Sequence, residues 1–435
     1  MIKIIIILLL LTFISFFQWS RTSEKSVASL CEITKDIRKC PENLGSIFLP
    51  RTFSARAIYV GFNREQIHLD FLETLITEIS KLEVAPKLNI FIPQGEEYDA
   101  HDILKKYFNQ KAYSFINLIP VASKESVWAQ DYLEILFNTQ TGQSEIVDLP
   151  YYEREGENLP ASVALVCQKD LIPQAEFSTE FKPGNGDYGG NIEPITTKIL
   201  TVGTNLTDET FKVLQSLTVQ EIVELNVDWL ETGHVDELLT TLPFKKNAKP
   251  CEQALLIASP KLALDIITAT SLDLKEEKNP NSPFYDDKDI WKDHYHCLYQ
   301  KNKKKSDCIE LEKANLSYQK LIDLGIDKIQ KLMLKNHGCR LTEEKFPQLF
   351  VPLKKQKEYG TYDDRAIALN PNSVNNIFFF PNLMLARQNF QPFQDAVDKV
   401  LSKYPYKRIY IDDKFAHELN GGIHCATNIS YGCSP

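Results

Sequence analysis

The chain has 435 residues, of which 43% are hydrophobic, 11% aromatic and 25% charged. This composition is typical of a globular protein and excludes whole-chain disorder, collagen and coiled coil. Its 58 acidic residues outnumber its 49 basic residues, which gives a formal charge of −9. That balance argues against nucleic acid as a partner and suits a cationic substrate.

The N-terminal segment is typical of an export signal. Lys3 precedes an apolar run of about 14 residues, which is shorter than the roughly 20 residues of a membrane span. We therefore expect residues 1–22 to be a signal peptide and the protein to be secreted. Small residues at 27–29 offer only a distant cleavage point, so an uncleaved N-terminal anchor is the alternative. No other stretch of the sequence is apolar enough to cross a bilayer.

Helices and short strands are expected to alternate after a short N-terminal extension, residues 23–55. Apolar residues at helical spacing predict a helix over 64–83, and residues 87–93 predict a strand. Further helices are expected at 309–334 and 393–403. Other β-branched apolar runs predict strands at 114–121, 133–137, 146–149, 199–202, 222–225, 255–257, 377–380 and 408–411. This alternation predicts an α/β fold.

A single domain over residues 56–435 is the simplest organisation of the chain. No internal repeat is found at the roughly 20 to 50 residue periods of solenoids, and no low-complexity linker divides the sequence. Residues 273–305 are polar and rich in lysine. We interpret them as a solvated surface insertion and not as a nucleic-acid patch, because the net charge is acidic.

Nine cysteines, an odd number, indicate an oxidising compartment and one thiol left over. With Cys425 set aside, the other eight could form four disulfides, and several free buried cysteines are the alternative. No spacing of cysteine and histidine is typical of zinc. Asn205, Asn315 and Asn428 lie in Asn-x-Ser/Thr sequons, so we expect a glycoprotein.

Four local clusters place polar groups in apolar or glycine-rich surroundings, at 128–134, 185–193, 229–237 and 420–428. Each cluster is a weak signal by itself. In a strand, His234 and Asp236 would lie on one face, but a structural histidine satisfied by its neighbours would give the same pattern. A lone cysteine such as Cys425 is more often structural than catalytic.

Together and in this order, the clusters resemble those of the peptidylarginine deiminase family, within the guanidino-group-modifying superfamily. The family motifs Trp-x-Gln-Asp, Gly-Asn-x-Glu, Gly-His-Val-Asp-Glu and His-Cys-x-Thr-Asn are met at 128–131, 190–193, 233–237 and 424–428. Residues 346–350 and 379–382 also resemble family segments. The resemblance covers residues 110–430 and implies the pentein fold, an α/β propeller with five pseudosymmetric blades.

The expected chemistry makes sense of these residue types. Arginine's guanidinium is planar, charged and poorly electrophilic, so its hydrolysis needs carboxylates to hold it and a strong nucleophile. The resemblance implies Asp131 and Asp236 as the carboxylates and Cys425 as the nucleophile, which would form a covalent thiouronium intermediate. His234 would protonate the departing ammonia and then deprotonate the attacking water, leaving citrulline.

Two aromatic residues of these motifs, Trp128 and His424, are not expected to take part in the bond-making steps. Trp128 would place its ring against the guanidinium or its alkyl stem, and a plain core tryptophan is the alternative. His424 precedes Cys425, and on an extended strand it would point away from the site. We therefore do not expect His424 to be the general acid.

The family resemblance also implies calcium. Gln130, Glu134 and Glu193 match side-chain ligands of the family site, and backbone oxygens of Gly189 and Ile192 complete the set. Hard oxygen ligands suit Ca²⁺. A salt bridge at a strand end is the alternative for Glu134. A second family site has Tyr132 where an acidic residue is expected, and only Asp148 remains as its ligand. Extracellular calcium would fill the retained site constitutively.

Substrate choice is the least defined part of the resemblance. Family members read the peptide backbone with arginines, and here Arg154 is the candidate, while Leu419 and Asn420 stand before the cysteine motif in place of a basic residue. Proteins or peptides containing arginine are the expected partners. The alternatives are a hydrolase of free arginine or another small guanidine, and a catalytically silent arginine-binding protein in which Cys425 pairs with Cys433.

Overall fold

The structure is a computed structural model of the chain. It describes residues 31–33, 39–40, 45–107, 111–121, 128–149, 159–172, 185–270, 306–352, 365–388, 390–413, 416 and 421–433. The expected signal peptide, the expected insertion at 273–305 and Arg154 lie outside the described residues.

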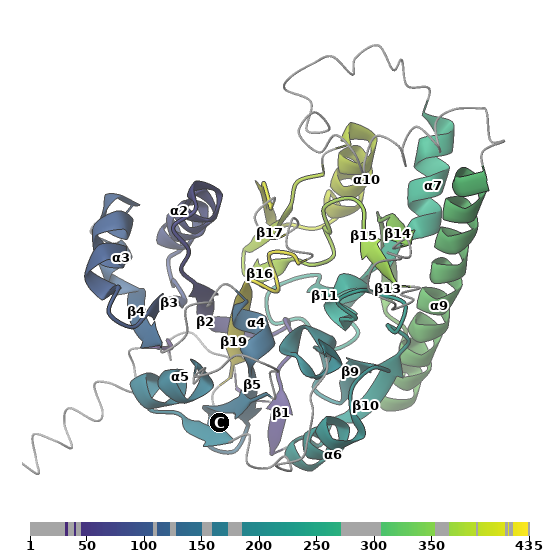
Figure 1. The fold of residues 1–435 in the computed structure, drawn as a ribbon. Helices are drawn as coiled ribbons and strands as arrows, with labels where there is room; N and C mark the ends of the chain where they lie inside the picture. The colour runs from purple at the N-terminus through teal and green to yellow at the C-terminus, as the bar shows by residue number, and fades with distance from the viewer. Residues whose placement is uncertain are drawn as a thin grey trace, which may run out of the picture.

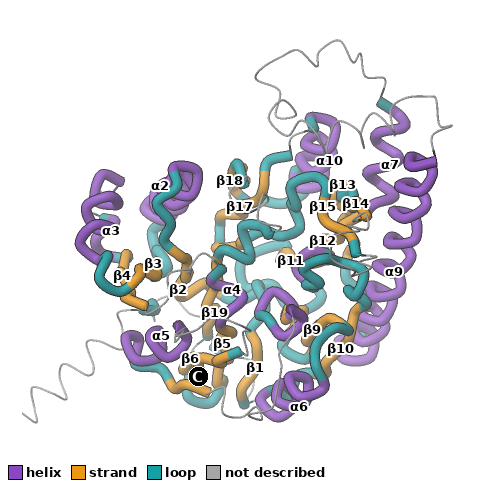
Figure 2. Tube along the Cα trace, viewed as in Figure 1, coloured by secondary structure: helices purple, strands orange, loops and turns teal. Residues whose placement is uncertain are grey.

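One arrangement of strands recurs five times within the described ranges. An antiparallel pair of strands leads through a helix to a third strand, which lies parallel to its neighbour in the pair. The sequence shows no repeat because the units share topology and not side chains. The helices lie at the outside of the molecule and the strands lie further inside (Figure 1, Figure 2).

The units follow one another along the chain, except that the C-terminal strand β19 belongs to the first unit. The first contains β19 (Thr427–Gly432), β2 (Ser54–Gly61), α2 (Gln66–Ser80) and β3 (Lys87–Pro93), extended by β4 (Ile116–Val121). The second contains β5 (Leu133–Asn138), β6 (Gln143–Asp148), α5 (Leu159–Cys167) and β7 (Asp170–Ile172), extended by β1 (Ser46–Phe48). The third contains β8 (Ile192–Thr196), β9 (Ile199–Gly203), α6 (Asp208–Leu217) and β10 (Glu221–Leu225).

The remaining units lie in the C-terminal half. The fourth contains β11 (Leu239–Pro243), β12 (Gln253–Ser259), α7 (Pro260–Ala269), α9 (Ser306–His337) and β13 (Thr342–Pro347). The fifth contains β16 (Ile377–Phe379), β17 (Asn382–Ala386), α10 (Gln391–Leu401) and β18 (Lys407–Ile411). A two-stranded sheet lies between them, formed by β14 (Phe350–Pro352) and β15 (Ala366–Ala368). None of these described sheets closes on itself.

The predicted α/β fold is confirmed. The helix expected at 64–83 is α2, and the helices expected at 309–334 and 393–403 are α9 and α10. The eight other predicted strands coincide with β4, β5, β6, β9, β10, β12, β16 and β18. The apolar face of α2 explains why this helix could be predicted from the sequence. Leu72, Leu75 and Ile79 are fully buried against the strands of its unit.

The N-terminal residues are tied into this fold by strands, disulfides and ion pairs. Residues before the expected boundary at 56 form β1, which pairs with β5. Disulfides join Cys31 to Cys167 and Cys40 to Cys433. Because β19 also pairs with β2, the C-terminal strand completes the sheet begun near the start of the described chain.

Two of the three sequon asparagines are buried in the folded chain. Asn315 and Asn428 are buried, and their Nδ2 groups donate to backbone oxygens of Phe350 and Leu133. The half-buried Asn205 donates from Nδ2 to the backbone oxygen of Gly233 at 3.0 Å. Asn315 and Asn428 are thus buried in the folded protein, where a glycan would have no room, whereas glycosylation at the half-buried Asn205 stays a prediction.

None of the helices in the described part of the chain is both long enough and apolar enough to cross a membrane.

Candidate active site

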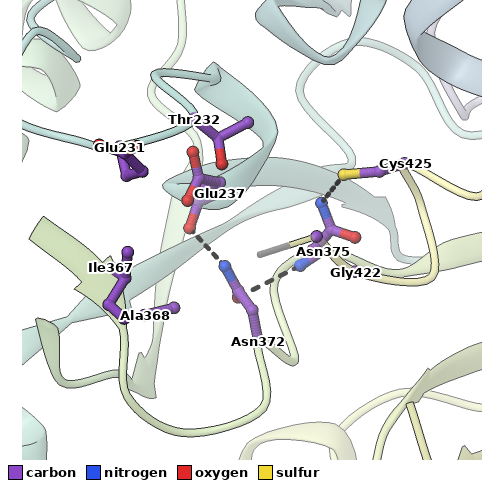
Figure 3. A pocket seen from close by; sticks show the side chains of 10 residues that line it. Glu231, Thr232, Glu237, Ile367, Ala368, Asn372, Asn375, Gly422 and Cys425 are labelled. Carbon is purple, nitrogen blue, oxygen red and sulfur yellow. Dashed lines mark hydrogen bonds between the residues drawn. The ribbon is translucent and has the colours of Figure 1, made fainter. Parts of the chain in front are cut away.

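Cys425 lies at a cavity between two chain segments. The turn before β19 carries Gly422 and Cys425, and the facing loop carries Asn372 and Asn375 (Figure 3). Glu237 lines the same cavity from a third segment. The cavity volume is about 30 Å³, and the cavity is partly open to solvent. The Cys425 thiol is 4% exposed and is the free cysteine of the described residues. Since Cys433 pairs with Cys40, the alternative of a Cys425–Cys433 disulfide is wrong.

Asp236 forms the centre of the hydrogen-bond network beside the thiol. Its Oδ2 atom accepts from Asn375 Nδ2 at 2.9 Å, from His424 Nδ1 at 2.8 Å and from the Cys425 thiol at 3.6 Å. Its Oδ1 atom is buried and has no hydrogen-bond partner among the described residues. A buried carboxylate oxygen of this kind is suited to accept from a cationic ligand.

Asn375 is a site residue that the sequence reasoning missed. Its Nδ2 group donates to Cys425 Sγ at 3.4 Å as well as to Asp236, and its Oδ1 accepts from the backbone N–H of His424 at 2.8 Å. Asn372 Oδ1 in turn accepts from the backbone N–H of Asn375. The sequence signal was a run of three asparagines at 372, 375 and 376 just before a predicted strand.

The expectation that His424 points away from the site is wrong. His424 belongs to a turn and not to a strand, so the alternation of strand side chains does not apply. Its ring contacts the same Asp236 oxygen as the thiol does, and the residue is only 9% exposed. His424 therefore belongs to the site, where it holds the carboxylate of Asp236 in place.

His234 and Asp236 come from one short turn, the 3-10 helix η6 (Val235–Glu237), and not from the strand that we expected. His234 is fully buried, and its ring lies against Gly190 so closely that a Cβ there would be 2.4 Å from Nδ1. Asn191 fixes the turn by accepting from the backbone N–H of Val235 at 3.2 Å. The Gly-Asn motif therefore supports the histidine that follows 44 residues later.

The helix α4 (Ala129–Tyr132) brings the first motif to the thiol. The backbone N–H of Gln130 donates to the backbone oxygen of Cys425 at 3.1 Å. Asp131 is buried in this helix. The half-buried Trp128 packs against two core clusters, and its ring lies against Gly421 at the edge of the cavity.

Burial and negative charge together raise the pKa of the Cys425 thiol well above its usual value. Burial is the largest cause, followed by the carboxylates of Asp236 and Asp131. The thiol is therefore protonated in the substrate-free protein, and a bound cation would favour the thiolate. Burial also raises the pKa of Glu237 to about 7, so this cavity-lining carboxyl titrates near neutral pH.

Replacing Asp131 by asparagine is expected to make the resting thiol more reactive. Because one of the charges that raise the pKa of the Cys425 thiol is removed, that pKa should fall and the thiol should react at lower pH. The measurement is the rate of Cys425 alkylation by iodoacetamide as a function of pH, read by mass spectrometry. Glu237→Gln is the matched control, since Glu237 lines the cavity but does not contribute to the shift. An unchanged rate profile in Asp131→Asn would contradict this electrostatic account.

Three of the expected calcium ligands converge next to α4. The side-chain amide of Gln130 contacts Glu134 Oε1 and lies 3.4 Å from the backbone oxygen of Gly189. A Cβ at Gly189 would be 2.8 Å from Glu134 Oε1, so glycine is required for this approach. Burial raises the pKa of Glu134 well above its usual value, and the nearby Glu193 and Asp236 raise it further. A cation would relieve this excess of negative charge.

Glu193 and Ile192 begin strand β8, beside η5 (Gly189–Asn191). Glu193 is buried, and its Oε1 accepts from Thr240 Oγ1 at 2.6 Å. No group of three or more His, Cys, Asp or Glu side chains able to hold a metal occurs among the residues the structure describes. The candidate set instead combines two carboxylates with amide and backbone oxygens, which fits a hard cation such as Ca²⁺ and not zinc.

Comparison with known proteins gives the family. A protein-family model described as protein-arginine deiminase (PAD) matches residues 179–433, more than half of the chain. The chain belongs to this family. The match includes Glu193, His234, Asp236 and Cys425, and the contact of α4 with Cys425 adds Gln130 and Asp131 to the same site.

Curated members of the protein-arginine deiminase family are similar over much of the chain. Protein-arginine deiminase type-1 of Mus musculus is 29% identical over 302 residues, which is 65% of this chain and 39% of that protein. The Homo sapiens type-1 protein is 28% identical over 360 residues, or 74% of this chain and 49% of that protein. The chain thus spans about half the length of these relatives or less.

Solved structures support the fold of this protein-arginine deiminase family member. Agmatine deiminase of C. jejuni has a TM-score of 0.52 and 14% identity, over 91% of this chain and 100% of that chain. Agmatine deiminase of Enterococcus faecalis has a TM-score of 0.52 and 12% identity, over 91% and 99%. At these identities the likeness concerns the fold alone.

Proposed function

We propose that the protein hydrolyses the guanidinium group of arginine side chains in proteins or peptides to citrulline and ammonia. The observation that carries this proposal is the buried free thiol of Cys425 at a cavity, in contact with the carboxylate of Asp236. Membership of the protein-arginine deiminase family supports the same reaction.

The site supplies the groups that this reaction needs. Asp236 and Asp131 accept hydrogen bonds from the guanidinium, and its positive charge lowers the pKa of the thiol between them. The thiol releases its proton to solvent, and the thiolate adds to the guanidinium carbon. His234 gives a proton to the departing nitrogen, the C–N bond breaks, and ammonia leaves a thiouronium bound to Cys425.

The second half of the reaction restores the enzyme. His234 takes a proton from water, the resulting hydroxide adds to the thiouronium carbon, and the C–S bond breaks. The ureido group of citrulline forms and Cys425 regains its thiol. Asn375 and His424 hold the thiol and Asp236 in their places throughout. Trp128, at the edge of the cavity, contacts the alkyl stem of the substrate.

We also propose that calcium binds next to α4. Gln130, Glu134, Glu193 and the backbone oxygens of Gly189 and Ile192 would hold the ion, in keeping with the convergence of the first two side chains on Gly189. When bound, calcium neutralises the buried carboxylates and fixes α4 relative to Cys425. Arg154 is proposed as a reader of the peptide backbone.

Two further expectations join this proposal. The five recurring units would surround the cavity as a pseudosymmetric propeller, in keeping with their shared topology. The protein would be secreted, and the three disulfides among its described residues support an oxidising compartment.

The test is citrulline release from a blocked arginine peptide and from free arginine, each in calcium and in chelator. We expect turnover of the peptide in calcium and its loss in chelator. Glu134→Gln should reproduce the loss, because it removes one carboxylate from the calcium set. Turnover of free arginine alone would favour the small-guanidine alternative. Full activity in chelator would contradict the role of calcium.

A further inference from the structure

We propose that Arg51 acts as a built-in cation of the candidate calcium site, which stabilises the metal-free site and weakens its affinity for calcium. The inference rests on the proposed calcium site. Arg51 lies in the turn between β1 and β2, outside the range of the family match at 179–433. The N-terminal segment of this chain therefore contributes a side chain next to the candidate calcium site.

The first observation is a buried ion pair at a candidate ligand. Arg51 Nε lies 3.6 Å from Glu193 Oε1, and both side chains are 4% exposed. The same oxygen accepts from Thr240 Oγ1 at 2.6 Å. The carboxylate that would help to hold calcium thus already has a cationic partner and a hydroxyl donor from the protein.

The second observation is a hydrogen bond made by another nitrogen of the same guanidinium. Arg51 Nη1 donates to Asn376 Oδ1 at 2.8 Å, and Asn376 Nδ2 donates to the backbone oxygens of Ser373 and Val374. The neighbouring Asn375 contacts the Cys425 thiol. Arg51 therefore joins the candidate calcium site to the loop that forms one wall of the cavity.

The electrostatic consequences follow from burial. Removing one partner of a buried ion pair leaves an uncompensated charge, so loss of Arg51 should destabilise the metal-free protein. A positive charge next to a ligand oxygen also opposes a divalent ion, and this repulsion is poorly screened in a buried site. Loss of Arg51 should therefore strengthen calcium binding.

The experiment compares the full-length wild-type protein with Arg51→Met and Arg51→Gln. Calcium affinity is measured by titration calorimetry, and melting temperature is measured in chelator and in saturating calcium. We expect both variants to bind calcium at least about tenfold more tightly than the wild-type protein. Their melting temperatures should be lower than the wild-type value in chelator and should rise by more than the wild-type value does when calcium is added. Arg51→Gln keeps a neutral hydrogen-bonding group at this position, so its comparison with Arg51→Met separates the loss of charge from the loss of polarity.

Arg56→Met is the matched control. Arg56 is a buried arginine whose partner is Glu32, and no candidate calcium ligand contacts it in the described structure. We expect it to lower the melting temperature without changing calcium affinity. Wild-type affinity in both Arg51 variants would overturn the inference and leave the calcium proposal standing. No calcium binding by any of the proteins would overturn both, whereas citrulline release would still test the catalytic proposal separately.

Discussion

Replacing Cys425 by alanine is expected to abolish citrulline release from arginine peptides while the protein stays folded. Cys425 supplies the nucleophile in the proposed reaction and has no disulfide partner, so its loss should remove the covalent step and no cross-link. Loss of a catalytic nucleophile costs ~10⁴-fold or more in kcat. The measurements are kcat for a blocked arginine peptide in calcium and the melting temperature of the variant.

A matched control removes cysteines that serve structure. The double variant Cys251→Ala with Cys339→Ala deletes a disulfide that closes a long loop and does not line the cavity. We expect it to melt earlier, because a disulfide restricts the unfolded chain, and to retain its kcat. Turnover by Cys425→Ala at a rate close to the wild-type rate would refute a nucleophilic role for this thiol.

Replacing Asp236 by asparagine is expected to reduce kcat/KM on the order of 10³-fold or more, because a charged acceptor for the guanidinium is lost. The structure also predicts the effect on stability. Asp236 is 1% exposed, and its Oδ1 has no partner among the described residues, so the change removes a buried charge. The melting temperature should therefore stay at or above the wild-type value, a trade of activity for stability that is common at active sites.

Glu32→Gln provides the contrast for Asp236→Asn. Glu32 is also 1% exposed, but it pairs with Arg56 at 3.2 Å and Lys169 at 2.9 Å, and these cations help to lower its pKa despite burial. Breaking these buried pairs should cost ~3 kcal/mol of unfolding free energy and leave kcat/KM of the folded protein unchanged. If Asp236→Asn instead lost stability as Glu32→Gln does, with normal kcat/KM, its role would be structural.

The charge balance of the candidate calcium site can be tested with one variant that removes negative charge and one that removes positive charge. Glu134→Gln removes negative charge from the candidate ligand set, and Arg51→Met removes positive charge beside it. We expect the first to weaken calcium binding and the second to strengthen it. Opposite effects of the two variants would place both residues in one electrostatic system.

Local sequence patterns were sufficient for many of the elements and for the list of site residues. Periodic apolar residues predicted α2, α9 and α10, because a helix that buries one face must repeat its apolar residues every three to four positions. Helices with weaker patterns, such as α5, were not predicted. The four polar clusters contain Cys425, His234, Asp236 and Asp131, and the resemblance of these motifs to the family implied their roles.

Only the tertiary structure decided which other side chains complete the site. Asn375 donates to both Asp236 and the thiol, and His424 lies in a turn where it contacts the same carboxylate. Asn375 is 139 residues from Asp236 and 50 from Cys425. Neither contact has a local signature, because the backbone turns and the docking of separate units bring these residues together.

By itself, the sequence determined the α/β class, three of the described helices, nine of the described strands and the family resemblance, and it named the thiol and the carboxylates as candidate site residues. These depend on residue types and short periodicities, which act over a few positions along the chain. The tertiary structure decided the pairing of Cys433 with Cys40, the burial of two of the three sequon asparagines, and the contact between Arg51 and Glu193. Those outcomes depend on packing between distant segments, and burial then sets the charge state and the hydrogen-bond partners of each group.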